Sequence, residues 1–88
     1  MTPLLPRGVR LHDDRVRGVP VLLGPERAVI LDAIGQAILA EVDGLRTTAE
    51  IVSNLAQKYN APAAEIAADV TAFLADLHSQ RLLDDADA

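Results

Sequence analysis

Short apolar runs separated by turn residues fill the first third of the chain and predict three β-strands. Over residues 9–12 apolar and polar side chains alternate, which is the period-two pattern of a strand with one apolar face. Two further apolar runs follow at Val19–Leu23 and Ala28–Leu31. Pro20 confines the second run to a sheet edge or to a strand start, because proline has no N–H for the ladder. We therefore expect a short three-stranded antiparallel sheet.

The third run fits either a strand or a helix. Pro25 could begin a helix, and the apolar spacing from Val29 to Val42 also fits one long helix. However, Val29 and Ile30 are β-branched and favour a strand, and Asp32 is among the strongest helix N-caps. We prefer a strand through Leu31, followed by a helix that Asp32 caps.

Apolar residues then recur at helical spacing and predict three helices. The first begins at Ala33 and stops near Gly44, a residue typical of helix C-termini; its apolar face is formed by Ile34, Ile38 and Val42. The second begins at the capping box of Thr47 and Glu50. Its buried stripe comprises Ile51, Val52, Leu55, Ala56 and Tyr59.

The longest helix is predicted over residues 62–80, after the break at Asn60–Pro62. Its apolar face is Ile66, Val70, Phe73, Leu74 and Leu77, and Glu65, Asp69 and Asp76 share a neighbouring face. Leu82–Leu83 closes the ordered core of residues 6–83, and residues 84–88 read as a frayed acidic tail. Together these elements predict one α+β domain over residues 1–88, winged-helix-like, with a short sheet followed by three helices.

Composition narrows the function. The chain has 88 residues and no cysteine, which excludes disulfides, thiolate metal sites and a cysteine nucleophile. Tyr59 and Phe73 are its only aromatic residues, so we expect an aliphatic core. Residues 1–31 carry a net charge of +2 and residues 32–88 a net charge of −7. That asymmetry fits either solubility alone or two faces that meet different partners. No signal peptide or membrane span is evident, so we expect a cytoplasmic protein.

Residues for catalysis or metal binding are poorly placed. His12 and His78 are the only histidines and fall on different predicted elements, so we expect no metal. The acidic pairs Asp13–Asp14 and Asp84–Asp85 are neighbours in sequence and do not bracket a substrate. Neither Gly24 nor Gly44 lies in a phosphate-binding pattern. We expect a binding module with no cofactor, not an enzyme.

Two kinds of partner suit a short sheet with three helices. A winged-helix protein binds DNA through a helix that carries Lys or Arg, but residues 62–80 have neither and are acidic. The alternative is an extended peptide, which can add as a strand to a sheet edge beside an amphipathic helix. The sequence favours the peptide.

A resemblance to a known family makes this reading more specific. The residues that carry it are Val9–Leu11, Asp14, Leu22–Leu23, Pro25–Glu26, Leu31, Ile38–Leu39, Asp43–Gly44, Thr48, Glu50–Ile51, Leu55, Tyr59, Asp69–Val70, Phe73–Leu74, Leu77 and Leu82–Leu83. In order and spacing they resemble the PqqD family, over about Pro6 to Leu83. No single motif among them is specific. Gly24 departs from the family pattern, in which alanine is expected before Pro-Glu.

The resemblance implies a peptide chaperone in the biosynthesis of pyrroloquinoline quinone. Such proteins bind the ribosomally made precursor peptide PqqA and present it to PqqE, a radical S-adenosylmethionine enzyme. It also implies that the peptide pairs with the third strand and lies against the third helix. In this chain that places peptide contacts at Arg27, Ala28, Val29, Ile30, Leu31, Asp69, Phe73, Asp76 and Leu77.

Two matters stay open on the sequence. Val29, Leu31, Phe73 and Leu77 fit a buried core as well as a peptide contact. A leader-recognition domain of another peptide-modifying pathway would also show this pattern. The sequence does not fix the oligomeric state, and a homodimer is among the states it allows.

Overall fold

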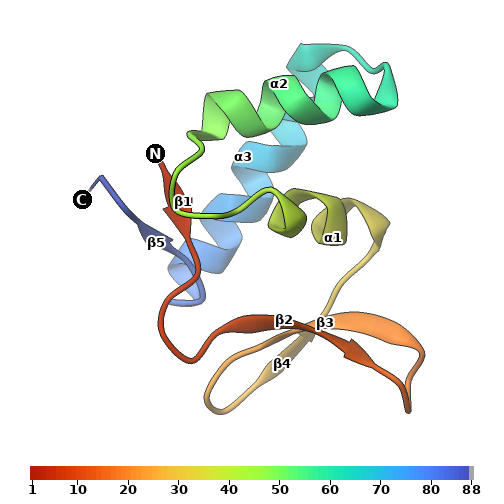
Figure 1. Ribbon diagram of the computed structural model, residues 1–88, viewed down its shortest axis with the longest axis vertical. Helices are drawn as coiled ribbons and strands as arrows, with labels where there is room; N and C mark the ends of the chain where they lie inside the picture. Colours follow the sequence, from red (N-terminus) through yellow and green to blue (C-terminus); the bar gives the residue numbers. More distant parts are fainter. Residues whose placement is uncertain (88) are drawn as a thin grey trace.

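A computed structural model describes residues 1–87 and shows a small sheet beneath three helices (Figure 1). In chain order the elements are β1 (Pro3–Leu4), β2 (Arg10–Asp14), β3 (Val19–Leu23), β4 (Ala28–Ile30), α1 (Ala33–Ala40), α2 (Thr48–Tyr59), α3 (Ala63–Ser79) and β5 (Asp84–Asp85). The predicted α+β class, with a three-stranded antiparallel sheet followed by three helices, is confirmed. None of these helices is long and apolar enough to span a membrane.

The main sheet has the strand order β2-β3-β4, so β3 is central and β4 lies at an edge. The sequence argument that Pro20 confines its run to a sheet edge or a strand start was therefore wrong, because Pro20 is the second residue of the central strand. Proline is tolerated there because its position opposes Leu31, just past the end of β4. The Pro20 carbonyl still accepts the Leu31 N–H at 3.0 Å. The ladder therefore loses only the hydrogen bond that an N–H at position 20 would have donated.

The helix starts follow the predicted caps. Asp32 Oδ1 accepts the N–H of Gly35 at 2.7 Å, and Thr47 and Glu50 form a complete capping box. The end of α1 was misplaced, because the helix stops at Ala40 and not near Gly44. Gly44 instead has φ +78° and donates its N–H to the Pro3 carbonyl at 3.1 Å. That bond, to a strand distant in sequence, turns the backbone away from the helix axis.

The connection from α1 to α2 is an ordered turn built around Asp43. Its carboxylate accepts the backbone N–H groups of Leu45 at 2.9 Å and Arg46 at 2.8 Å. The Arg46 and Leu45 N–H groups hold the pKa of Asp43 below its usual value, because they stabilise the charged form.

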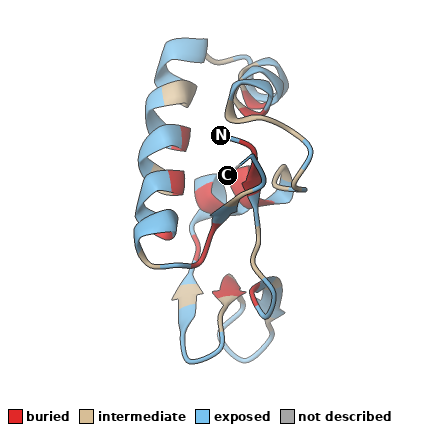
Figure 2. Cartoon of the chain, turned by 90° about the vertical axis from the view of Figure 1, so that its left-hand side faces the viewer, coloured by how far each residue is buried: buried red, intermediate tan, exposed pale blue. Residues whose placement is uncertain are grey.

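The core is aliphatic, as expected from the composition. Buried residues lie on the inward sides of the helices, and most residues of α3 are exposed (Figure 2). The buried cluster consists of Val9, Leu22, Leu31, Ile38, Leu39, Ile51, Leu55, Val70, Leu74, Leu77, Leu82 and Leu83. Among the residues predicted on the buried faces of the helices, two are exposed: Ile34 at 57% and Tyr59 at 54%. The others that lie outside the cluster are half-buried: Val42, Val52, Ala56, Ile66 and Phe73. Ile34 and Tyr59 both border a gap between the helices that the core does not fill.

The two ends of the described chain pair with each other, which the sequence did not predict. Strand β5 runs antiparallel to β1, and Asp85 Oδ1 accepts the N–H of Thr2 at 3.0 Å. The expected frayed tail after Leu83 was wrong for residues 84–87, and the ordered part reaches back beyond Pro6. Ala88, the last residue of that expected tail, lies outside the described residues.

Candidate functional site: an edge strand beside the last helix

Strand β4 presents backbone hydrogen-bonding groups at the edge of the sheet. The Arg27 carbonyl accepts the Gly24 N–H at 2.9 Å, and the Leu31 N–H reaches Pro20. Residues 27 and 31 therefore face β3. Alternate residues of an antiparallel strand face opposite sides in the plane of the sheet. Ala28 and Ile30 accordingly direct their N–H and C=O groups away from β3.

Side chains tie the end of α3 to Arg27, the residue just before β4. Arg27 Nη1 donates to Gln80 Oε1 at 3.0 Å, and Gln80 Nε2 donates to Asp76 Oδ2 at 3.0 Å. These two hydrogen bonds bring together Arg27 and Asp76, both predicted as peptide contacts. Gln80 links them, and sequence reasoning missed it because a glutamine after the helix carries no distinctive pattern.

At the other end of β4, the first turn of α1 packs against α3. A Cβ built on Gly35 would lie 3.0 Å from Cε1 of Phe73, so glycine is what permits this approach. Arg27 is thus level with Gln80, and the start of α1 is level with Phe73. The segment from Arg27 to Gly35, which contains β4, therefore runs antiparallel to the second half of α3. We call the surface between β4 and this half of α3 the groove.

The nine residues predicted as peptide contacts fall into three classes of burial. Leu31 and Leu77 are core residues, 5% and 1% exposed. Val29 and Phe73 are half-buried and pack against the core. The exposed residues are Arg27, Ala28, Ile30, Asp69 and Asp76. Leu31 and Leu77 are thus part of the core, and the other seven side chains are at least partly exposed.

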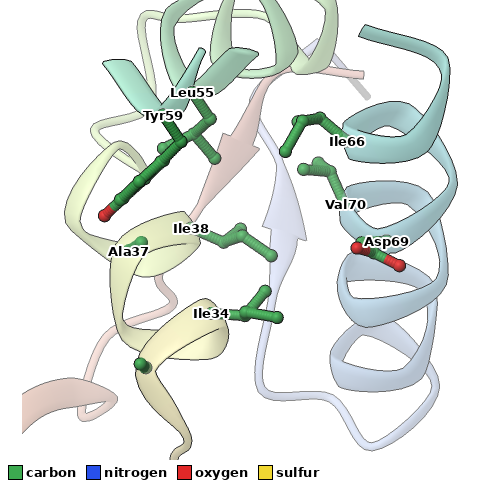
Figure 3. Close-up of a pocket in the computed structure, with 9 residues that line it drawn as sticks. Ile34, Ala37, Ile38, Leu55, Tyr59, Ile66, Asp69 and Val70 are labelled. Atoms are coloured by element: carbon green, nitrogen blue, oxygen red, sulfur yellow. The ribbon is translucent and has the colours of Figure 1, made fainter. Parts of the chain in front are cut away.

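A second feature is an apolar cavity among the three helices, with a volume of about 260 Å³ (Figure 3). Ile34 and Ile38 of α1 point across it toward Val70 and Asp69 of α3, and Leu55 and Tyr59 of α2 lie above. The lining is completed by Ala33, Ala37 and Ile66. Sequence reasoning missed this cavity, although two alanines on the inner side of α1 were a signal that α1 cannot fill the space.

Metal chemistry has no candidate site in the part of the chain that the structure describes. Within residues 1–87 no three His, Asp or Glu side chains cluster closely enough to hold an ion. His12 lies on β2 and His78 near the end of α3, as the sequence indicated. Residues 1–87 instead offer an open sheet edge at β4 and an apolar cavity.

Known proteins with the same fold and similar sequence identify the family. Residues 21–83 match the family model "Coenzyme PQQ synthesis protein D (PqqD)". A "PqqA binding protein" of Rhizobium meliloti is 49% identical over 80 residues, which span 91% of this chain and 82% of that protein.

Solved structures agree with this match. The solution NMR structure of the PqqD truncation of Methylobacterium extorquens PqqCD has a TM-score of 0.80 and 48% identity, and the match covers 93% of this chain and 87% of that one. That domain is described as a functional, stand-alone recognition element for ribosomally synthesized and post-translationally modified peptides. TbiB1, solved in complex with the TbiA(beta) leader peptide, shares the fold, with a TM-score of 0.77 at 23% identity, over 92% of this chain and 94% of that one. The family match, the close relatives and the shared fold together show that this chain belongs to the PqqD family.

Proposed function

We propose that this protein binds the precursor peptide PqqA as an added strand on β4 and presents it to the radical S-adenosylmethionine enzyme PqqE. The protein itself performs no catalysis in this proposal and acts in the cytoplasm, where the peptide is made. Its family membership supports the choice of peptide. The observation that carries the binding mode is the outward orientation of the Ala28 and Ile30 backbone groups beside α3.

Strand addition uses the parts of the groove in different ways. Backbone hydrogen bonds to Ala28 and Ile30 would supply affinity that tolerates many peptide sequences. Side chains of the peptide that point inward would meet Val29 and Phe73, which are half-buried. Ile30, which is 59% exposed, would pack against an outward-facing side chain of the added strand. Asp69 and Asp76 would contribute charge along the helix side.

Amide hydrogen exchange tests this geometry directly. In the protein without peptide, the Ala28 and Ile30 amides should exchange rapidly, because they face away from β3. Saturating synthetic PqqA should slow both amides by about tenfold or more, since each gains a backbone acceptor. The opposite edge of the sheet, strand β2, is the alternative place where the peptide could add. If the Leu11 and Asp13 amides of β2 become protected and those of β4 do not, the peptide adds to the wrong edge for this proposal.

A proline substitution tests the same bond by binding. Ile30→Pro removes one outward N–H, and the ladder to β3 stays intact, which is the setting in which strands tolerate proline. We expect PqqA affinity to fall about tenfold or more, measured by calorimetry. Ile30→Val is the matched control, because it keeps the N–H and most of the apolar surface. Equal affinity of the two variants would argue against strand addition.

Presentation to the enzyme is tested separately, with PqqE and PqqA together. The wild-type protein should raise the yield of cross-linked peptide in a reaction with PqqE, and Ile30→Pro should raise it less. If the yield is the same with and without the protein, the protein still binds the peptide but does not act as a chaperone for PqqE.

A further inference from the structure

The apolar cavity among α1, α2 and α3 lies on the same track as the groove beside β4. Only Leu31 and Asp32 separate β4 from α1, and the next two residues, Ala33 and Ile34, line the cavity. On α3, Asp76 and Phe73 lie in the half that ends near Gln80. The cavity lining begins one turn before Phe73, at Asp69 and Val70 (Figure 3). Asp69 lines the cavity and lies one helical turn before Phe73.

The cavity is built to receive an apolar group. Its floor is core, since Ile38, Val70 and Leu55 are at most 4% exposed, whereas Ile34 and Tyr59 stand open at its mouth. Apolar surface left open costs free energy that a side chain entering from outside would recover. A volume of about 260 Å³ is ample, because a cavity of about 150 Å³ already admits a benzene ring.

The distance from the groove defines which part of a bound peptide could reach the cavity. The middle of the cavity wall on α3, residues 66–70, lies about 7 Å along the helix from Phe73, at about 1.5 Å per residue. An extended chain covers that length in about two or three residues, at about 3.3 Å each. A peptide paired with β4 would therefore place its next few residues over the cavity mouth.

We infer that the cavity is a second anchor for the same peptide and takes one aliphatic or aromatic side chain, about two or three residues beyond the segment that pairs with β4. This inference rests on the proposed function. Asp69 supplies the one charged side chain of the lining, and α3 carries no Lys or Arg. The peptide residue next to the anchor is therefore basic, so that it meets the Asp69 carboxylate at the rim.

Filling the cavity tests the anchor. Ala37→Leu adds bulk at the wall of α1, and Ala40→Leu is the matched control, because Ala40 is on the same helix but outside the lining. We expect Ala37→Leu to weaken PqqA binding at least fivefold and Ala40→Leu to leave it within twofold. Ile34→Ala, which removes an exposed wall without adding bulk, should also weaken binding and serves if Ala37→Leu does not fold.

An alanine scan of the apolar residues of PqqA completes the test. At one peptide position, alanine should weaken binding to the wild-type protein but weaken binding to Ala37→Leu little further, because that variant has already lost the contact.

Two results would overturn the inference and leave strand addition standing. In the first, Ala37→Leu and Ile34→Ala bind PqqA as tightly as the wild-type protein does, whereas Ile30→Pro binds it more weakly. The other is a change of oligomeric state in Ala37→Leu with peptide affinity unchanged, which would assign the cavity to a second copy of this chain. If wild-type protein does not bind PqqA, the proposed function and this inference fail together.

Discussion

Arg27 and Gln80, 53 residues apart, join the turn before β4 to the end of α3 through a hydrogen bond of 3.0 Å between their side chains. Both groups are near the surface, so the bond contributes little to the free energy of unfolding. Its place in the molecule matters more, because the Gln80 amide also donates to Asp76, so that Arg27 and Asp76, two expected peptide contacts, share one partner.

Arg27→Ala should therefore affect binding more than stability. We expect the free energy of unfolding to change by about 0.5 kcal/mol or less, as is usual for an exposed side chain. PqqA affinity should fall about threefold to tenfold. Arg10→Ala on β2 removes the same charge on the opposite edge of the sheet and should leave binding nearly unchanged. If both variants bind equally weakly, net charge and not the Arg27–Gln80 pair is responsible.

Asp69 lines the cavity and lies one turn before Phe73 on α3, so we expect its carboxylate to contact the peptide. Asp69→Ala is exposed on α3 and should shift stability by about 0.5 kcal/mol or less. We expect a loss of about 1 kcal/mol in peptide affinity, with melting unchanged. Glu65→Gln, on the same helix and also exposed, is the control. An equal loss in that variant would mean that the acidity of α3 as a whole, and not Asp69, is recognised.

The sequence predicted the elements that depend on local signals. The capping box at Thr47, the Asp32 cap and the third strand are all set by residues a few positions apart, and each is confirmed. The pairing of β1 with β5 was missed because two-residue strands have no period, and their register depends on contacts across the whole chain. Helical spacing also placed Ile34 and Tyr59 on buried stripes.

Periodicity could not show that Ile34 and Tyr59 would face a cavity, because spacing gives the side of a helix and not the distance to the next one. The groove residues show the same limit. The pattern of alternate positions indicated that β4 has two faces, and the resemblance indicated which helix it meets. Which contacts are core and which are open depended on the packing of Leu31 and Leu77, whose side chains the structure places inside.

Two glycines with similar φ angles allow the cost of a left-handed backbone to be distinguished from the cost of a steric clash. Gly44 has φ +78°, and a Cβ there would lie 2.7 Å from Cδ1 of Leu4. Gly18 has φ +69°, with nothing within 4 Å of such a Cβ. Alanine should cost about 1–2 kcal/mol at either site, because a left-handed backbone disfavours a side chain. We expect Gly44→Ala to lower the free energy of unfolding more than Gly18→Ala does, because the new methyl group must displace the Leu4 side chain. Equal urea midpoints for the two variants would show that Leu4 yields freely.

The terminal pairing should make stability depend on pH in the acid range. The N–H groups of Asp87 and Thr2 hold the pKa of Asp85 below its usual value, because they stabilise the carboxylate in the folded state. A carboxyl group whose pKa is lowered by folding stabilises the protein above its unfolded pKa. That contribution is lost as the pH falls from about 4 through the lower folded value.

Asp85→Asn should reveal that dependence by difference. The asparagine oxygen can still accept hydrogen bonds but carries no charge, so the variant should melt at a lower temperature than wild type near neutral pH. The gap should narrow below about pH 4, where Asp85 of the wild-type protein also becomes neutral. Asp84→Asn removes the same charge one residue earlier and serves as the control for net charge. A gap between wild type and Asp85→Asn that stays constant from neutral pH to about pH 2 would mean that the Asp85 charge does not hold the two termini together.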